Sequence, residues 1–159
     1  MRFFLLLTAL LLAGCGFHLR GQVAMPFDTL YLKATNPGTL LILDLRRSLE
    51  VNNIELVDGA EEADVVLDVV FENTDKQVLS LGADGRVNEF RLNQHVSLRA
   101  YDLQQRDWLP AEEFTQRRDF SYDDTQILAK EAEEALLQKS MRTDMVQQII
   151  RRLSNAKPH

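Results

Sequence analysis

Apolar residues recur along this chain with two different periods, and each period predicts a different kind of element. Leu41, Leu45 and Leu49 recur every four positions within residues 40–51, with charged residues on the other side. This spacing is typical of an amphipathic helix with one buried face. A second helix is expected after residue 122; with about 25–30 residues, it would be roughly 40 Å long. Its expected buried stripe, which only Arg142 interrupts, comprises Leu128, Ala132, Ala135, Val146, Ile149 and Leu153.

Alternation of apolar and polar residues predicts strands over residues 28–33, 64–81, 90–100 and 108–122. Gly82-Ala83-Asp84-Gly85 is a tight hairpin signal between the second and third of them. Pro110 cannot donate to a strand ladder, so the start of the last strand should be irregular or lie at a sheet edge. Residues 54–56 are interpreted as a short extended piece.

The strand at 90–100 has an apolar face and a polar face. The apolar face carries Phe90, Leu92, Val96, Leu98 and Ala100. The opposite face carries Glu89, Arg91, Asn93, His95, Ser97 and Arg99. The element order allows a right-handed parallel crossover first and antiparallel hairpins afterwards. We therefore expect an α/β (α+β) fold, a two-layer sandwich in which a mixed four-stranded sheet carries two helices on one face. The other face would be polar and free, or covered by a partner.

The first fifteen residues read as a secretion signal. Arg2 precedes a ten-residue apolar run at 3–12, which is too short for a stable membrane span of about 20 residues. Leu12-Ala13-Gly14-Cys15 resembles the lipobox of bacterial lipoproteins. That resemblance implies cleavage before Cys15, whose thiol takes a diacylglycerol and whose new amine is acylated. Several acyl chains suffice for stable anchoring. The alternatives are an unlipidated signal with a chance cysteine, or a buried apolar helix.

These features divide the chain into four parts. We expect a signal peptide at 1–14, a lipidated tether at 15–27, an α/β domain at 28–153 and a disordered tail at 154–159. By resemblance to lipoprotein sorting, Gly16 in place of aspartate favours the outer membrane. A lipidated Cys15 would also leave no cysteine for a disulfide.

Charge and chemistry narrow the function further. The chain has 24 acidic and 18 basic residues and a net charge of -6, which argues against nucleic acid as a partner because binding it needs a basic surface. His18, His95 and His159 lack metal-ligand spacing. His95 and Ser97 share a strand face that most simply faces solvent. We therefore expect no catalytic residues, no metal and no cofactor beyond the lipid on Cys15.

Six cations lie in the long strands of this acidic chain. They are either ordinary surface scatter or a local patch that neutralises an anionic ligand. They are Lys76, Arg86, Arg91, Arg99, Arg117 and Arg118. We expect Arg91 and Arg99, on the polar strand face, to contact a partner protein.

Cys-Gly-Phe-His-Leu-Arg at 15–20 resembles the start of mature LPS-assembly lipoproteins of the LptE family, and the order of elements matches that family as well. The resemblance implies a non-enzymatic plug inside the outer-membrane β-barrel LptD, with which it delivers lipopolysaccharide. It implies a lipid-anchored protein on the periplasmic side and inside the barrel lumen. The alternative is a lipoprotein scaffold of another envelope machine, or a periplasmic ligand-binding lipoprotein.

The same resemblance indicates two lipopolysaccharide-binding positions. The family can carry a basic residue before Asn-Gly in the hairpin at 80–89; here that position is Ala83, and Arg86 is the nearest cation. Leu128-Ala129-Lys130 matches the family at the start of the last helix. Arg86 and Lys130 are therefore the expected phosphate ligands. Apolar side chains beside them would form an edge for acyl chains, at Leu79, Leu81, Ile127 and Leu128.

Overall fold

The computed structural model describes residues 23–158. Within them, one five-stranded sheet has the order β2-β1-β3-β4-β5. The strands are β1 (Thr29–Ala34), β2 (Glu55–Leu56), β3 (Val65–Leu81), β4 (Val87–Tyr101) and β5 (Asp107–Ser121). β1 pairs in parallel with β2 and β3, whereas β3, β4 and β5 form antiparallel pairs. The expected mixed sheet and its first parallel crossover are confirmed.

The predicted number of strands was one too low. The short piece expected at 54–56 joins the sheet as β2 because its backbone finds partners along β1. The Glu55 amide donates to the Asp28 carbonyl over 3.0 Å, and the Val57 amide donates to the Leu30 carbonyl over 3.1 Å. A two-residue strand has too short a pattern to be recognised by alternation.

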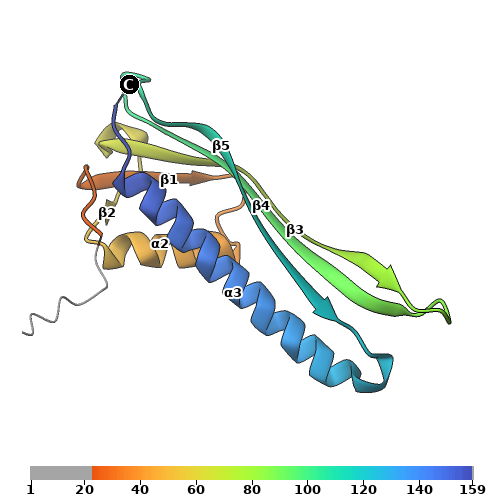
Figure 1. Ribbon diagram of the computed structural model, residues 1–159. Helices are drawn as coiled ribbons and strands as arrows, with labels where there is room; N and C mark the ends of the chain where they lie inside the picture. Colours follow the sequence, from red (N-terminus) through yellow and green to blue (C-terminus); the bar gives the residue numbers. More distant parts are fainter. Residues whose placement is uncertain (1–22, 159) are drawn as a thin grey trace, which may run out of the picture.

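Helices α2 (Leu40–Val51) and α3 (Ile127–Ser154) lie on the same side of the sheet (Figure 1). The α2 helix begins where the Thr39 hydroxyl accepts a hydrogen bond from the Ile42 amide, a common N-cap arrangement. Short 3-10 turns occur at Ala60–Glu62 and Asp124–Gln126. The expected two-layer sandwich with both helices on one face is confirmed.

The buried side chains of the described chain form two clusters. The larger one joins β1, α2, the second half of α3 and the adjoining strands. The smaller one consists of Leu92, Phe120 and Met141, with Phe90, Tyr122 and Leu137 packed against it. Polar residues lie on the helix side between the two, where Gln94 is buried and the Gln116 amide donates to Gln148 over 3.2 Å. The outer half of the sheet therefore has its own small core.

The expected buried stripe of α3 was wrong over its first half. Leu128 is 82% exposed, and Ala132 and Ala135 are exposed as well. The reason is that α2 covers only the second half of α3, so the same helix face is bare further from the main core (Figure 1). The residues of α3 that are buried are Met141, Met145, Val146, Ile149, Ile150 and Leu153.

The molecule is elongated (Figure 1). The first described residues lie at one end, where the Val23 amide donates to the Asn52 side chain over 2.7 Å. β3 is 17 residues long, which corresponds to roughly 55 Å at 3.3 Å per residue. It ends in the hairpin Gly82–Gly85, at the opposite end of the molecule. We call that hairpin and the start of α3 the distal end.

β5 is the outermost strand on its side of the sheet, and its ladder with β4 shifts register around Pro110. The expectation that this stretch is irregular and at an edge is confirmed.

Candidate functional site

The distal end brings Arg86 and the start of α3 together. Arg86 Nη1 donates to Asp124 Oδ2 over 2.9 Å, so the hairpin bends toward the 3-10 turn before α3. A cavity of about 390 Å³ lies between them. Its lining comprises Asp84, Arg86, Val87, Asn88, Tyr122, Asp123, Asp124 and Thr125. Two segments that are far apart in the sequence thus form one surface.

Lys130 and Arg86 are both engaged by carboxylates. Lys130 Nζ lies 2.9 Å from Glu133 Oε2 and 3.1 Å from the Ser121 hydroxyl, and its side chain is only 15% exposed. Arg86 lies 3.5 Å from Asp84 in addition to its bond with Asp124. An anionic ligand would therefore have to replace protein carboxylates at both cations.

Asp123 adds a further negative charge at this end. Hydrogen bonds from Thr125 lower the pKa of Asp123, and the charge of Lys130 adds to the effect. Asp123 therefore stays ionised, so acids outnumber cations here. The side chains expected to form an apolar edge are accessible at the same end. They are partly or largely exposed, namely Leu79, Leu81, Ile127 and Leu128.

The sheet face away from the helices carries Arg91 and Arg99, as expected. Arg91 donates two hydrogen bonds, of 2.7 and 2.8 Å, to the carboxylate of Asp119. This hydrogen bonding raises the pKa of Arg91 and lowers the pKa of Asp119. Arg99 lies 3.7 Å from Asp68 and over the Tyr101 ring. The charged side chains of this face are therefore held in place by ion pairs, and they can present a defined pattern of charges to a polar partner.

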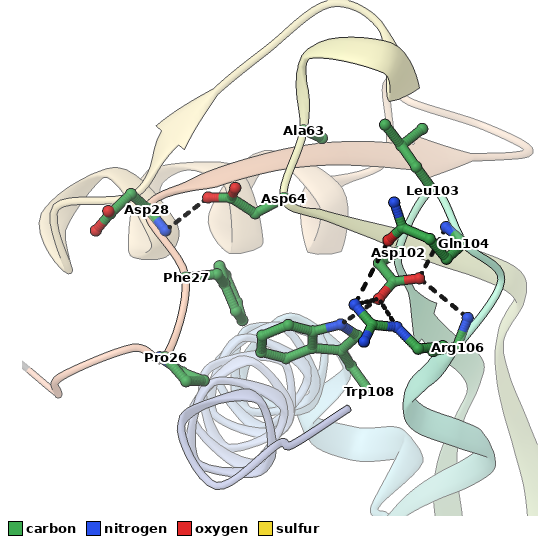
Figure 2. A pocket seen from close by; sticks show the side chains of 10 residues that line it. All are labelled: Pro26, Phe27, Asp28, Ala63, Asp64, Asp102, Leu103, Gln104, Arg106 and Trp108. Carbon is green, nitrogen blue, oxygen red and sulfur yellow. Dashed lines mark hydrogen bonds and ion pairs between the residues drawn. The ribbon is translucent and has the colours of Figure 1, made fainter. Parts of the chain in front are cut away.

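A further cavity of about 440 Å³ lies at the end of the molecule where the described chain begins (Figure 2). The edge of the Phe27 ring meets Trp108, with centroids 5.8 Å apart. Asp102 is buried beside them. Its Oδ1 accepts from the backbone amides of Gln104 and Arg106, and its Oδ2 accepts from Arg106 Nε and Trp108 Nε1.

Asp102 was not singled out from the sequence. Burial would raise its pKa, but the hydrogen bonds from Arg106 and Trp108 outweigh burial, so the pKa lies below its ordinary value. The available signal was an aspartate opening a turn, since such side chains bind backbone amides two residues on. The turn also holds Gln105 at a φ of 60°. This carboxylate shapes the turn between β4 and β5, with all its lone-pair directions occupied by the chain itself.

Within residues 23–158, no cluster of three histidine, cysteine or acidic side chains is placed to hold a metal ion. No helix in that range is long and apolar enough to cross a membrane. Cys15, the signal peptide and most of the tether lie outside the described residues, and their assignments stay predictions.

Comparison with known proteins identifies the family. Residues 27–153 match the family described as LptE: Lipopolysaccharide-assembly. The chain is 30% identical over 155 residues to the LPS-assembly lipoprotein LptE of Pectobacterium atrosepticum, a match that covers 92% of this chain and 80% of the relative. It is 32% identical over 150 residues to the LPS-assembly lipoprotein LptE of Yersinia pestis, a match that covers 92% of this chain and 72% of the relative. The chain belongs to the LptE family.

Solved structures share the LptE-family fold. Lipoprotein B of Nitrosomonas europaea superposes with a TM-score of 0.75 at 37% identity, over 87% of this chain and 90% of that one. Rare lipoprotein B of Shewanella oneidensis superposes with a TM-score of 0.69 at 27% identity, over 78% of this chain and 92% of that one.

The LptE match coincides with the packed domain. It begins at Phe27, which packs against Trp108, and ends at Leu153, a fully buried residue of α3. The resemblance seen in the N-terminal motif is thereby confirmed over the whole folded domain. The chain is a member of a lipoprotein family of lipopolysaccharide assembly.

Proposed function

We propose that this chain is a non-enzymatic outer-membrane lipoprotein that plugs the β-barrel LptD and, with it, assembles lipopolysaccharide at the cell surface. The observation that carries the proposal is the family match over the entire packed domain, residues 27–153. The lipobox at residues 12–15 supports membrane attachment. The lack of a metal cluster among the described residues is compatible with a role in binding.

The lipid on Cys15 would hold the domain close to the membrane. Eight residues, 15–22, separate that position from Val23. Fully extended, they span at most about 29 Å. The distal end lies on the far side of the long strands (Figure 1), so it would project away from the anchor. Such a shape suits a plug that enters a barrel from the periplasmic side.

The polar face of the sheet is the surface we assign to the barrel. Barrel interiors are lined by polar side chains, and the paired charges of Arg91 with Asp119 and Arg99 with Asp68 complement such a lining. Because both arginines are already paired, their contribution to partner recognition is positional specificity more than net charge.

Arg86 and Lys130 are the proposed ligands of lipopolysaccharide phosphates at the distal end. The Arg86 side chain is 66% exposed, and exposed ion pairs contribute only about 0–1 kcal/mol. A phosphate can therefore displace Asp84 and Asp124 at small cost. The exposed leucines at 79, 81 and 128 lie at the same end for acyl chains.

Co-purification tests the function directly. The full-length lipoprotein is extracted in mild detergent and captured through a C-terminal tag, and the bound proteins are identified by mass. We expect a large outer-membrane β-barrel in near-equal amount. Recovery of a different envelope complex, or of a small periplasmic protein without a barrel, would contradict the proposal.

A further inference from the structure

One face of α3 passes from exposed to buried part-way along the helix. Its residues follow one another in steps of three or four, which places them on the same side. Those on the distal side of position 144 are exposed and the rest are buried. They are Leu128, Ala132, Ala135, Lys139 and Thr143, followed by Val146, Ile150 and Leu153. We call the exposed apolar part, Leu128, Ala132, Ala135 and the neighbouring Leu136, the outer strip.

The outer strip leads to a groove between α2 and α3. The groove has a volume of about 290 Å³, and we call it the α2–α3 groove. Its lining comprises Asp44, Arg47, Ser48, Val51, Lys139, Thr143, Val146 and Gln147. Lys139 belongs to the same helix face as the strip, so apolar surface and groove are continuous.

The α2–α3 groove has a local surplus of positive charge. Its one lining acid, Asp44, already accepts a bond of 2.6 Å from Arg142 and lies 3.3 Å from Arg47. Within residues 23–158, no carboxylate lies within ion-pair distance of the Lys139 ammonium. The chain as a whole carries a net charge of -6. A cationic groove in an acidic protein favours an anion.

The occupant must match both features, a cationic groove and an apolar strip. The chain's own tether does not match the cationic groove, because residues 15–22 carry His18 and Arg20 and no acid. A phosphorylated, acylated lipid matches both features, with its phosphate for the groove and its acyl chain for the strip. Leu136 is 69% and Leu128 82% exposed, and a contiguous exposed apolar patch commonly marks a binding site.

We propose that the α2–α3 groove and the outer strip bind one molecule of lipopolysaccharide, with a phosphate at Lys139 and Arg47 and an acyl chain along the strip. This site rests on the proposed function and is separate from Arg86 and Lys130. At the distal end the cations are neutralised by carboxylates, whereas Lys139 is available. About eleven residues of helix separate Leu128 from Lys139, or roughly 17 Å.

Two variants separate the two parts of the site. The groove variant, Arg47→Gln with Lys139→Gln, removes both cations. The strip variant, Ala132→Gln with Leu136→Gln, makes the strip polar with residues that favour helix. Arg151→Gln with Lys157→Gln is the charge-matched control, and Leu43→Gln, an exposed leucine of α2, is the apolar control. All four positions of the test variants are solvent-accessible, so thermal unfolding should hardly change.

Binding is measured on the full chain in detergent with three probes: purified lipopolysaccharide, its deacylated derivative and phosphatidylglycerol. We expect the groove variant to bind both lipopolysaccharide forms at least about tenfold more weakly, because it removes two cations that would hydrogen-bond the phosphate. The strip variant should lose affinity for the acylated form alone, and both controls should bind like the wild type.

The outcomes separate this inference from the proposed function. Wild-type binding that neither test variant alters would overturn the groove site and leave lipopolysaccharide binding in place. A wild-type protein that binds neither lipopolysaccharide form would remove lipopolysaccharide binding from the proposed function itself. Equal, variant-sensitive binding of phosphatidylglycerol would overturn the assignment to lipopolysaccharide in favour of a general anionic-lipid surface.

Discussion

At the scale of single residues, Asp102 fixes the end of the molecule nearest the proposed anchor. The carboxylate ties the β4–β5 turn to Arg106 and to Trp108, which in turn packs against Phe27 (Figure 2). One side chain thus joins a turn, a strand and the first residue of the LptE-family match. Its charge matters because every bond it accepts is stronger to the ionised form.

Acid should expose this dependence. The pKa of Asp102 is depressed in the folded protein because hydrogen bonds from Arg106 and Trp108 outweigh burial. The ionised carboxylate therefore stabilises the fold at pH values above its ordinary pKa of 3.8, and this stabilisation is lost as the pH falls through the lower pKa of the folded state. Asp102→Asn should lower the free energy of unfolding at pH 7. It should also make the decrease of that free energy at acid pH smaller than in the wild type. Denaturant unfolding at several pH values checks this. The control is Asp107→Asn, at an exposed position of the same region; identical pH profiles for wild type and Asp102→Asn would contradict the argument.

Cys15 is a residue-scale prediction of a different kind, since it concerns attachment. Cys15→Ser should leave the domain folded and abolish membrane anchoring, because the proposed acyl chains would be attached through this thiol and the new amine of the same residue. Metabolic labelling with a radioactive fatty acid should mark the wild type alone. Label retained by the variant would refute lipidation at this cysteine.

At the scale of elements, the sequence predicted helices and long strands well because their periods extend over many residues. It failed where the surroundings decide burial. Leu128, Ala132 and Ala135 have the spacing of a buried face, but the sequence does not reveal that α2 is too short to cover them. The extended piece at 54–56 was expected, but its place in the sheet as β2 was not, because two residues are too few to show an alternation pattern. The sequence left open whether Arg86 and Lys130 lie at the same end, and their pairing with Asp124 and Glu133 likewise depends on three-dimensional contacts.

The smaller core predicts that the distal half of the sheet loosens separately. Phe120→Ala removes the ring that stacks on Phe90 at 5.8 Å, and a buried Phe→Ala change typically costs about 3–5 kcal/mol. We expect faster amide exchange in the hairpin at 82–85 and around Leu92, with the main core still protected. The matched change Phe114→Ala, in the main core, should instead lower protection throughout. Equal loss of protection everywhere in Phe120→Ala would contradict two separable clusters.

The polar face of the sheet makes a prediction about the partner. Photo-crosslinking residues placed at Arg91 and Arg99 should give adducts with the barrel, because neither helix of the described chain covers that face (Figure 1). A crosslinker at Leu43, on the outer side of α2, is the comparison. Adducts from Leu43 alone would place the barrel against the helix layer and would refute the assigned orientation.

At the scale of the whole molecule, the elongated shape separates two tasks. The end with Phe27 and Asp102 lies near the tether, whereas the hairpin and the start of α3 lie at the far end of strands about 55 Å long. Six of the thirteen exposed large apolar side chains of residues 23–158 lie toward that far end, namely Val78, Leu79, Leu81, Ile127, Leu128 and Leu136. With the proposed lipid anchor at Cys15, these apolar side chains would be available to an amphiphile at a distance from the anchor.

Charge reversal at the distal end tests whether that amphiphile is held there. Arg86→Glu with Lys130→Glu should weaken binding of purified lipopolysaccharide by at least about tenfold, because two phosphate-binding cations become repulsive. Arg86 is largely exposed, but a carboxylate at position 130 would lie beside Glu133, so Arg86→Gln with Lys130→Gln is the milder variant that keeps the fold comparable in thermal unfolding. Arg151→Glu with Lys157→Glu matches the change in net charge. Unaltered affinity in the distal variants, together with weaker binding by Arg47→Gln with Lys139→Gln, would move the phosphate site from the hairpin to the α2–α3 groove. Of the two sites, only the groove offers a cation, Lys139, that no carboxylate of the described chain neutralises.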